Sequence, residues 1–148
     1  MAYENQQNVP SGGASFGAQA ELFPSIPLPD LNAAGGPAYA ARLKNGGDLM
    51  AILCNTGQPA RLDAVNSMRT LDHPSILRLM DSGIVLWPSD NIRYYAFAYQ
   101  RPLAPRLMQS LGDTLTPISD DALNHHFIMP IIGALSEFMR MGITHNAL

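Results

Sequence analysis

The sequence predicts an α+β protein in which an antiparallel sheet with one helix is followed by a separate long helix. Two pairs of strand-like segments are each joined by a short turn. Two other segments repeat apolar residues at the three-to-four spacing of an amphipathic helix. One helical segment falls between the strand pairs and the other follows both. Because strands joined by short turns pair antiparallel, we expect a sheet of four strands.

Size and charge limit the classes of function. The chain has 148 residues, of which 47% are hydrophobic, enough for one domain with a sizeable core. The net charge is -3 and no run of Arg or Lys occurs, so no surface for nucleic acid or anionic lipid is expected. No stretch approaches the roughly 18 apolar residues of a membrane span, and no basic segment precedes an apolar one at the N-terminus. We therefore expect a cytoplasmic protein without a membrane span.

The N-terminal part has no periodic pattern. Residues 1–22 are rich in Gln, Asn, Ser, Gly and Ala, so we expect a disordered, low-complexity lead-in. The next segment, Phe23–Asp30, contains three prolines, which remove donors from a strand ladder. We expect it to form an extended, polyproline-like strip that covers an edge of the sheet rather than a central strand.

Turn residues define the two predicted hairpins. The first pair of strands, Ala38–Leu43 and Asp48–Asn55, flanks an Asn-Gly dipeptide, which favours a tight turn. The second pair, Ile76–Val85 and Arg93–Gln100, flanks a segment of Pro, Ser, Asp and Asn. The only lysine of the chain, Lys44, lies in the first turn, where a solvated side chain is expected.

Apolar spacing and end signals define the helices. After Pro59, apolar residues at every third position predict a helix that ends before Pro74: Leu62, Val65, Met68 and Leu71. A short helix is predicted over residues 104–111. Ser119 is a suitable N-cap for a longer helix, which Pro130 should kink and Gly142 should end.

Five local strings resemble segments of the protein kinase family, in the order and spacing of that family. Leu71–Leu79 resembles L-x-H-P-N-I-v-x-L, and Ala38–Arg42 resembles V-Y-x-A-R. Met50–Leu53 falls where V-A-I-K is expected, Tyr95–Tyr99 where the gatekeeper and hinge lie, and His145–Leu148 at the place of H-R-D-L. The resemblance covers about residues 31–148.

The resemblance implies a domain organisation. Residues 23–103 would form a kinase-like N-lobe and hinge, and residues 104–148 the start of a truncated C-lobe. The type implied is that of bacterial serine/threonine kinases. The metal-binding D-F-G segment would lie beyond Leu148.

The resemblance also implies that the residues of phosphoryl transfer are replaced. The lysine that pairs with the phosphates falls at Leu53, its glutamate partner at Ala64 and the catalytic aspartate at Ala147. Since none of these side chains can do the required chemistry, we predict no catalytic residue and no cofactor.

ATP with Mg²⁺ is the one cofactor that the family would suggest. The glycine-rich loop keeps only Gly36, because its first two glycines are replaced by Leu31 and Ala33. A vestigial nucleotide site would comprise Gly36, Ala51, Phe97, Ala98 and Tyr99.

No metal site is expected either. The adjacent His125 and His126 point about 100° apart on a helix, so they cannot chelate one metal ion as an i, i+4 pair does. The single cysteine, Cys54, excludes an internal disulfide.

Our leading hypothesis is a catalytically inactive, pseudokinase-like domain that binds a protein partner or regulates a neighbouring domain of the same chain. One alternative is a divergent serine/threonine kinase whose remaining catalytic residues lie beyond Leu148. The other is an unrelated small α+β binding module.

Overall fold

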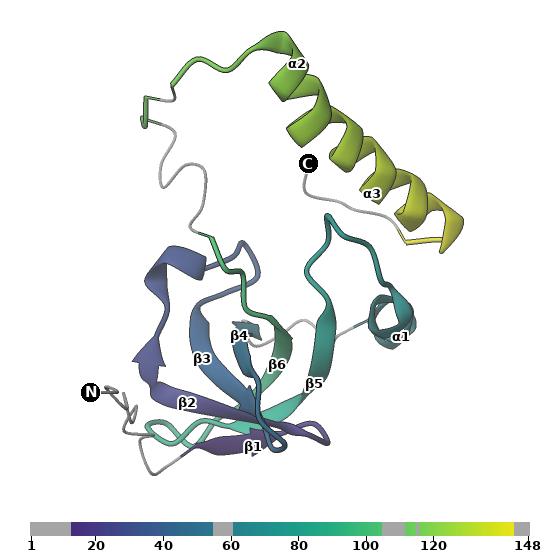
Figure 1. Cartoon of the computed structure of the whole chain (residues 1–148). Coiled ribbons are helices and arrows are strands. Elements are labelled where there is room, and N and C mark those ends of the chain that lie inside the picture. Colours follow the sequence, from purple (N-terminus) through teal and green to yellow (C-terminus); the bar gives the residue numbers. More distant parts are fainter. Residues whose placement is uncertain (1–12, 55–60, 105–111, 115, 144–148) are drawn as a thin grey trace, which may run out of the picture.

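The computed structural model describes residues 13–54, 61–104, 112–114 and 116–143. A curved antiparallel sheet occupies one end of the molecule, and a long helix lies at the other (Figure 1). The predicted α+β class, with one helix beside the sheet and a long helix after it, is confirmed.

The sheet has six strands in the order β1-β2-β3-β4-β6-β5. Both predicted hairpins are present, β3 with β4 and β5 with β6, and β6 also pairs with β4. The expected count of four strands was too low, because two further strands precede them. The strands are β1 Ala14–Phe16, β2 Ala20–Pro27, β3 Ala38–Leu43, β4 Asp48–Cys54, β5 Leu79–Leu86 and β6 Arg93–Gln100.

The expectation of disorder over residues 1–22 was wrong for residues 14–22, because β1 and the start of β2 lie there. Phe16, Ala20 and Leu22 are buried in the core of the sheet, which gives this segment the apolar contacts that its own composition lacks. Residues 1–12 lie outside the described part of the chain.

The expectation for Phe23–Asp30 was also wrong in part. Strand β2 lies between β1 and β3 rather than at an edge. Its proline-rich half is accommodated by a break in pairing, since the register with β3 shifts between Leu22 and Pro27. Proline cannot donate to a ladder, and this irregular stretch does not require it to do so. A 3₁₀ turn, Pro29–Leu31, follows.

The sheet curls until its two end strands, β1 and β5, contact each other. The enclosed core contains small side chains, which take little interior volume and so permit tight curvature. Five of its ten members are alanine: Phe16, Ala20, Leu22, Ala41, Leu49, Ala51, Leu53, Val85, Ala96 and Ala98.

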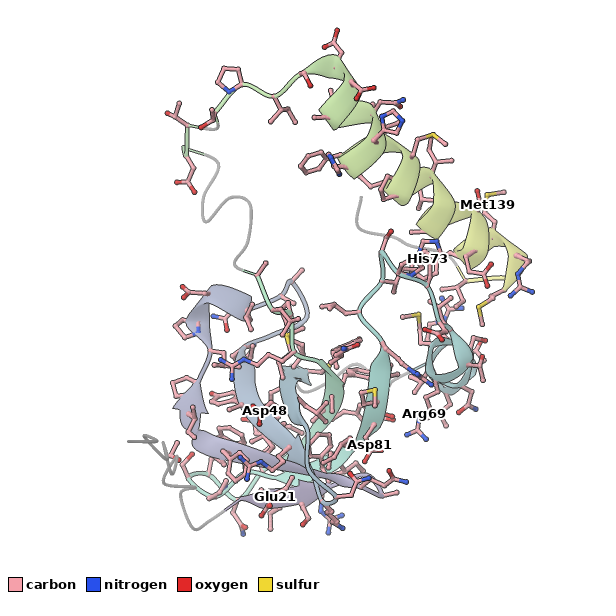
Figure 2. The ribbon with its side chains drawn as sticks, in the orientation of Figure 1. Glu21, Asp48, Arg69, His73, Asp81 and Met139 are labelled. Atoms are coloured by element: carbon pink, nitrogen blue, oxygen red, sulfur yellow. The ribbon has the colours of Figure 1, made fainter. Side chains whose placement is uncertain are left out.

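The buried carboxylate of Asp81 holds two elements against β5. They are the turn between β1 and β2 and the helix α1, Leu62–Thr70. Asp81 accepts hydrogen bonds from the backbone N–H groups of Gln19 at 2.8 Å, Ala20 at 3.0 Å and Ser82 at 2.8 Å. From α1, Arg69 donates to the Ser82 hydroxyl at 2.8 Å, and its guanidinium lies 3.6 Å from Asp81 (Figure 2). Asp81 therefore connects three elements that are distant in sequence.

The long helix consists of α2, Asp120–Leu123, a π-helical turn, Asn124–Ile128, and α3, Met129–Arg140. The predicted N-cap is confirmed, because the Ser119 hydroxyl accepts from the Ala122 N–H at 3.2 Å. Since Pro130 has no N–H to donate four residues back, the α-helical pattern is interrupted before it, and the interruption is the π turn. The helix ends at Gly142, whose φ of 67° is a left-handed value that glycine tolerates. Residues 105–111 of the predicted short helix lie outside the described residues.

Candidate functional site

Strand alternation gives β4 and β6 two different faces. Leu49, Ala51 and Leu53 point into the closed core. The alternate residues of β4 point to the opposite, open face, where each is paired with an aromatic residue of β6: Met50 with Tyr99, Ile52 with Phe97 and Cys54 with Tyr95. The open face is therefore a continuous apolar surface.

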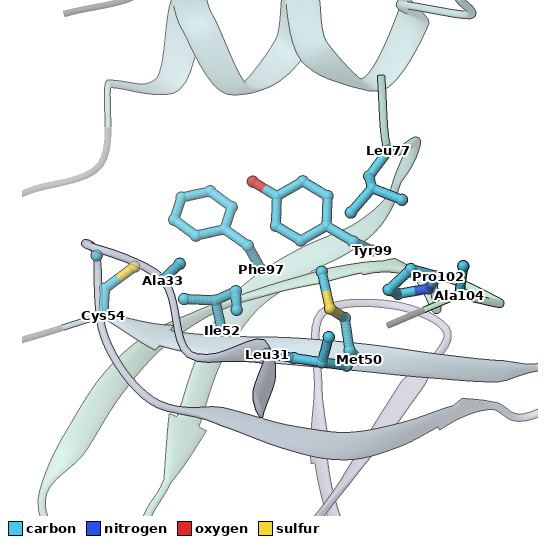
Figure 3. Close-up of a pocket in the computed structure, with 11 residues that line it drawn as sticks. Leu31, Ala33, Met50, Ile52, Cys54, Leu77, Phe97, Tyr99, Pro102 and Ala104 are labelled. Carbon is cyan, nitrogen blue, oxygen red and sulfur yellow. The ribbon is translucent and has the colours of Figure 1, made fainter. Parts of the chain in front are cut away.

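A pocket of about 590 Å³ lies on this open face (Figure 3). Strands β4 and β6 form its base, and the loop between β2 and β3, the segment before β5 and the segment after β6 form its rim. The lining residues are Leu31, Ala33, Gly35, Met50, Ile52, Cys54, Leu77, Phe97, Tyr99, Pro102 and Ala104. This volume is within the range of small-molecule sites in proteins.

Two of the five residues predicted for the vestigial nucleotide site, Phe97 and Tyr99, line this pocket. Ala51 and Ala98 are fully buried in the core behind it. Gly36 belongs to the rim loop but does not line the cavity.

The positions assigned to the lost catalytic groups do not meet in the pocket. Leu53 is buried in the core, so a lysine at this position would point away from the cavity, and the neighbouring pocket-facing residue is Cys54. Ala64 is half-buried on α1. Ala147 lies outside the described residues.

Motif matching missed Met50, Ile52 and Cys54 as lining residues. A signal was present in the sequence, because side chains on a strand alternate between faces and directly paired residues share a face. Once Phe97 and Tyr99 are placed in the pocket, their partners on β4 must be Ile52 and Met50.

The rim loop is closed on itself. The N–H of Ala33 donates to the Gly36 carbonyl, and the N–H of Gly36 donates to the Ala33 carbonyl, at 3.1 and 3.0 Å. The Pro37 carbonyl accepts from the Leu53 N–H at 2.9 Å, which ties the loop to the end of β4. The N–H groups of Ala33 and Gly36 therefore already have acceptors, and Pro37 has no N–H. A phosphate-binding loop, in contrast, must present free N–H groups.

The pocket lining is uncharged throughout its described part. Burial raises the pKa of the Cys54 thiol, so this group is neutral at pH 7. Burial, and then the proximity of Cys54, raises the pKa of the Tyr99 phenol. Lys44 lies instead in the β3–β4 turn, where its ammonium group donates to the Ala18 carbonyl at 3.4 Å. The described residues of the lining therefore include no cation that could neutralise a phosphate.

A second hollow, of about 440 Å³, lies between the segment before β5 and the long helix. Ser75, Ile76 and Leu77 face Phe127, Pro130 and other apolar residues of the helix across it. Five large apolar side chains of the helix, of which Ile131 also lines this hollow, are 43–80% exposed: Ile128, Met129, Ile131, Ile132 and Met139. This helix therefore has an apolar surface that the described residues leave uncovered.

Neither a metal site nor a membrane-spanning helix is found in the described part of the chain. Among the described residues, no group of three His, Cys, Asp or Glu side chains is placed to hold a metal ion. Within the same part of the chain, no helix has the length and apolar character needed to cross a membrane.

Comparisons with known proteins were made in sequence and in structure. No protein-family model matches the chain, and no curated protein matches it significantly in sequence. A solved structure of a PAN3 pseudokinase mutant from Neurospora crassa is similar to it, with a TM-score of 0.64 and 19% identity. The match covers 92% of this chain but only 37% of that one. The chain therefore has a protein-kinase-like fold, with an antiparallel N-lobe sheet followed by the first long helix of a C-lobe.

Proposed function

We propose that this is a pseudokinase-like domain that has kept the kinase fold, has lost phosphoryl transfer and acts by binding a protein partner or a neighbouring domain. One observation carries the proposal: the described lining of the pocket at the expected nucleotide position is uncharged, and the Ala33 and Gly36 amides of its rim loop are bonded within the protein. Phosphoryl transfer depends on cations and free amides that stabilise the phosphate oxygens.

The sequence adds independent support. In the family's pattern the positions of the lysine, glutamate and catalytic aspartate are taken by Leu53, Ala64 and Ala147. The placement of Leu53 in the core strengthens the argument, since a lysine introduced there alone would not reach the pocket. The residue in the nearest pocket-facing position, Cys54, is neutral at pH 7 because burial raises its pKa.

The proposal of a protein partner is supported by the exposed apolar side chains on the long helix. Ile131 and Ile132 are each about half exposed, and Met139 is 80% exposed. Burying a side chain of this kind stabilises a complex by roughly 1.5–3 kcal/mol, and contiguous exposed patches commonly mark interfaces. The partner would be another protein or a further domain of the same polypeptide.

Three finer assignments belong to the same proposal. Residues 23–103 would form the N-lobe and hinge, to which β1 and the start of β2 are now added, and residues 104–148 the start of the C-lobe. The related kinases would be of the bacterial serine/threonine type. The site of action would be the cytoplasm, which suits a chain with one cysteine.

The test is a phosphoryl-transfer assay with labelled ATP, Mg²⁺ and a generic protein substrate, on the longest natural form of the protein. We expect no turnover above a heat-inactivated control. Turnover that is abolished by Lys44→Ala would support the divergent kinase instead, because Lys44 is the only lysine among these 148 residues. Turnover that survives this substitution would indicate an unrecognised mechanism, and it too would contradict the proposal.

A further inference from the structure

The turn between β3 and β4 presents an Asn-Gly pair to solvent. Residues 44–48 are all exposed, and Asn45 is followed by two glycines, Gly46 and Gly47. Both glycines have left-handed backbone angles, with φ of 95° and 104°. A Cβ added to Gly46 would meet no atom within 4 Å, so among the described residues nothing packs against that side of the glycine. The side-chain amide of Asn45 and the backbone nitrogen of Gly46 are therefore neighbours in an uncovered turn.

Two backbone hydrogen bonds close this turn. The Gly46 N–H donates to the Leu43 carbonyl at 2.9 Å, and the Leu43 N–H donates to the Gly47 carbonyl at 3.1 Å. Hydrogen bonds in exposed turns open locally at a small fraction of the free energy of global unfolding. The pairing of β3 with β4 begins only at Arg42 and Asp48. Opening of the turn can therefore release the Gly46 nitrogen while the two strands stay paired.

We infer that Asn45 is a site of spontaneous deamidation, with water as the only co-reactant. The Gly46 nitrogen gives its proton to solvent and attacks the side-chain carbonyl carbon of Asn45. A nitrogen–carbon bond forms, and the bond to the side-chain nitrogen breaks, so that this nitrogen takes a proton from water and leaves as ammonia. Water then opens the five-membered succinimide at either carbonyl, which gives aspartate or isoaspartate. Glycine favours the attack because it has no Cβ beside the nitrogen.

The modification would change both the charge and the shape of the turn. Each event replaces a neutral amide by a carboxylate and so adds one negative charge to a chain whose net charge is -3. Isoaspartate also lengthens the backbone by one carbon. Because the Lys44 N–H donates to the Gln19 carbonyl at 2.8 Å, a longer backbone beside Lys44 would also disturb the contact with the β1–β2 turn. The inference does not depend on the proposed function.

The first test is incubation of the full 148-residue chain at pH 8 and 37 °C, followed by peptide mapping with mass spectrometry. We expect conversion to aspartate and isoaspartate at least tenfold faster at Asn45 than at Asn91. Asn91 is the internal control, because it is also exposed but is followed by Ile92, whose β-branched side chain crowds the attacking nitrogen. Conversion at Asn45 no faster than at Asn91 would overturn the inference. Conversion at Asn45 in urea alone would overturn it too, because the folded turn would then keep the nitrogen out of reach.

The second test compares two variants by ion-exchange chromatography, which separates the more acidic product from the intact chain. Asn45→Gln keeps the amide but requires a six-membered ring, which closes more slowly, so this variant should lose most of the acidic product. The matched control is Asn66→Gln, at an exposed position of α1, and it should form as much acidic product as the unchanged chain. Equal yields from the two variants would contradict the assignment to Asn45. These measurements do not involve ATP, so their failure would leave the proposed function standing.

Discussion

Gly36 shows how a single residue shapes the candidate site. Its φ of 150° lies in a region that residues with a side chain rarely adopt, and a Cβ added there would overlap the Leu53 carbonyl oxygen. The rim loop can therefore rest directly on the end of β4 only because this position is glycine. The one glycine that survives from the family's loop pattern thus has a structural role that needs no bound phosphate.

The prediction for this residue uses its neighbour as a control. Gly36→Ala should lower the free energy of unfolding by about 1–3 kcal/mol, because strained backbone and a steric overlap are both introduced. Gly35→Ala, whose added Cβ would meet no atom within 4 Å, should change it by less than about 0.5 kcal/mol. Urea unfolding followed by circular dichroism measures both. Equal effects would show that the loop does not rest on β4.

Asp81 is the residue on which the N-terminal hairpin depends. Asp81→Ala would leave the buried Ala20 amide and the partly buried Gln19 amide without their acceptor, so the free energy of unfolding should fall by about 1–3 kcal/mol. The control is Asp48→Ala, because the Asp48–Arg42 ion pair is exposed and 3.8 Å long, and such pairs contribute about 0–1 kcal/mol. Hydrogen exchange should also accelerate over residues 14–22 in the Asp81 variant alone. Unchanged protection there would contradict the proposed link.

The pH dependence of Cys54 follows from its surroundings. Burial raises its thiol pKa above the ordinary value of 9.0, and the thiolate is the nucleophile. Alkylation should therefore be slower than that of a free cysteine at pH 8, and its rate should still be rising at pH 9, where half of an ordinary thiol is already ionised. A plateau below pH 9 would show that Cys54 lies in a more polar environment than the structure describes.

At the scale of elements, the long helix illustrates how one proline changes helical geometry. Pro130→Ala restores a backbone N–H and removes a steric clash with the preceding turn, so the π turn Asn124–Ile128 should convert to α-helix. Helix stability should rise by up to about 3 kcal/mol, which is the difference between proline and alanine in a helix interior.

Hydrogen exchange over residues 124–134 measures this conversion. Ser136→Ala, at an exposed position of the same helix, serves as a control that changes helix propensity by only a few tenths of a kcal/mol. If protection in the Pro130 variant matches that in the control, the π turn has a cause other than the proline.

The elements also show which parts of the fold were predictable. The β3–β4 hairpin and the Ser119 cap depend on residues within a few positions of each other, and the sequence predicts both correctly. Strand β1 and the start of β2 depend on Asp81, about 60 positions away, so no local pattern indicates them.

The candidate site was predictable in part for a related reason. The aromatic residues Phe97 and Tyr99 were assigned to a vestigial nucleotide site from a motif resemblance, and the structure places both in the pocket lining. On β4 the same resemblance selected Ala51 and Leu53, which face the core, because a degenerate motif does not fix the register of a strand. A shift of one residue exchanges the two faces, and only the pairing with β6 determines which face is open.

At the scale of the whole molecule, the sheet and the long helix differ in how far their apolar side chains are buried. The sheet closes around a core whose members are at most 5% exposed. The long helix instead leaves large apolar side chains exposed, including Met129 at 56% and Met139 at 80%. The similar pseudokinase structure is covered over only 37% of its length.

We propose that the kinase-like fold is retained while nucleotide binding is lost. The most direct measurement is the melting temperature of the chain with and without a large excess of Mg-ATP. We predict no shift, because the described pocket lining has no cation and the Ala33 and Gly36 amides of its rim loop are already bonded. A ligand at about 100 times its dissociation constant would stabilise the folded protein by roughly 2.7 kcal/mol. A rise of several degrees that depends on Mg-ATP concentration would therefore contradict the account.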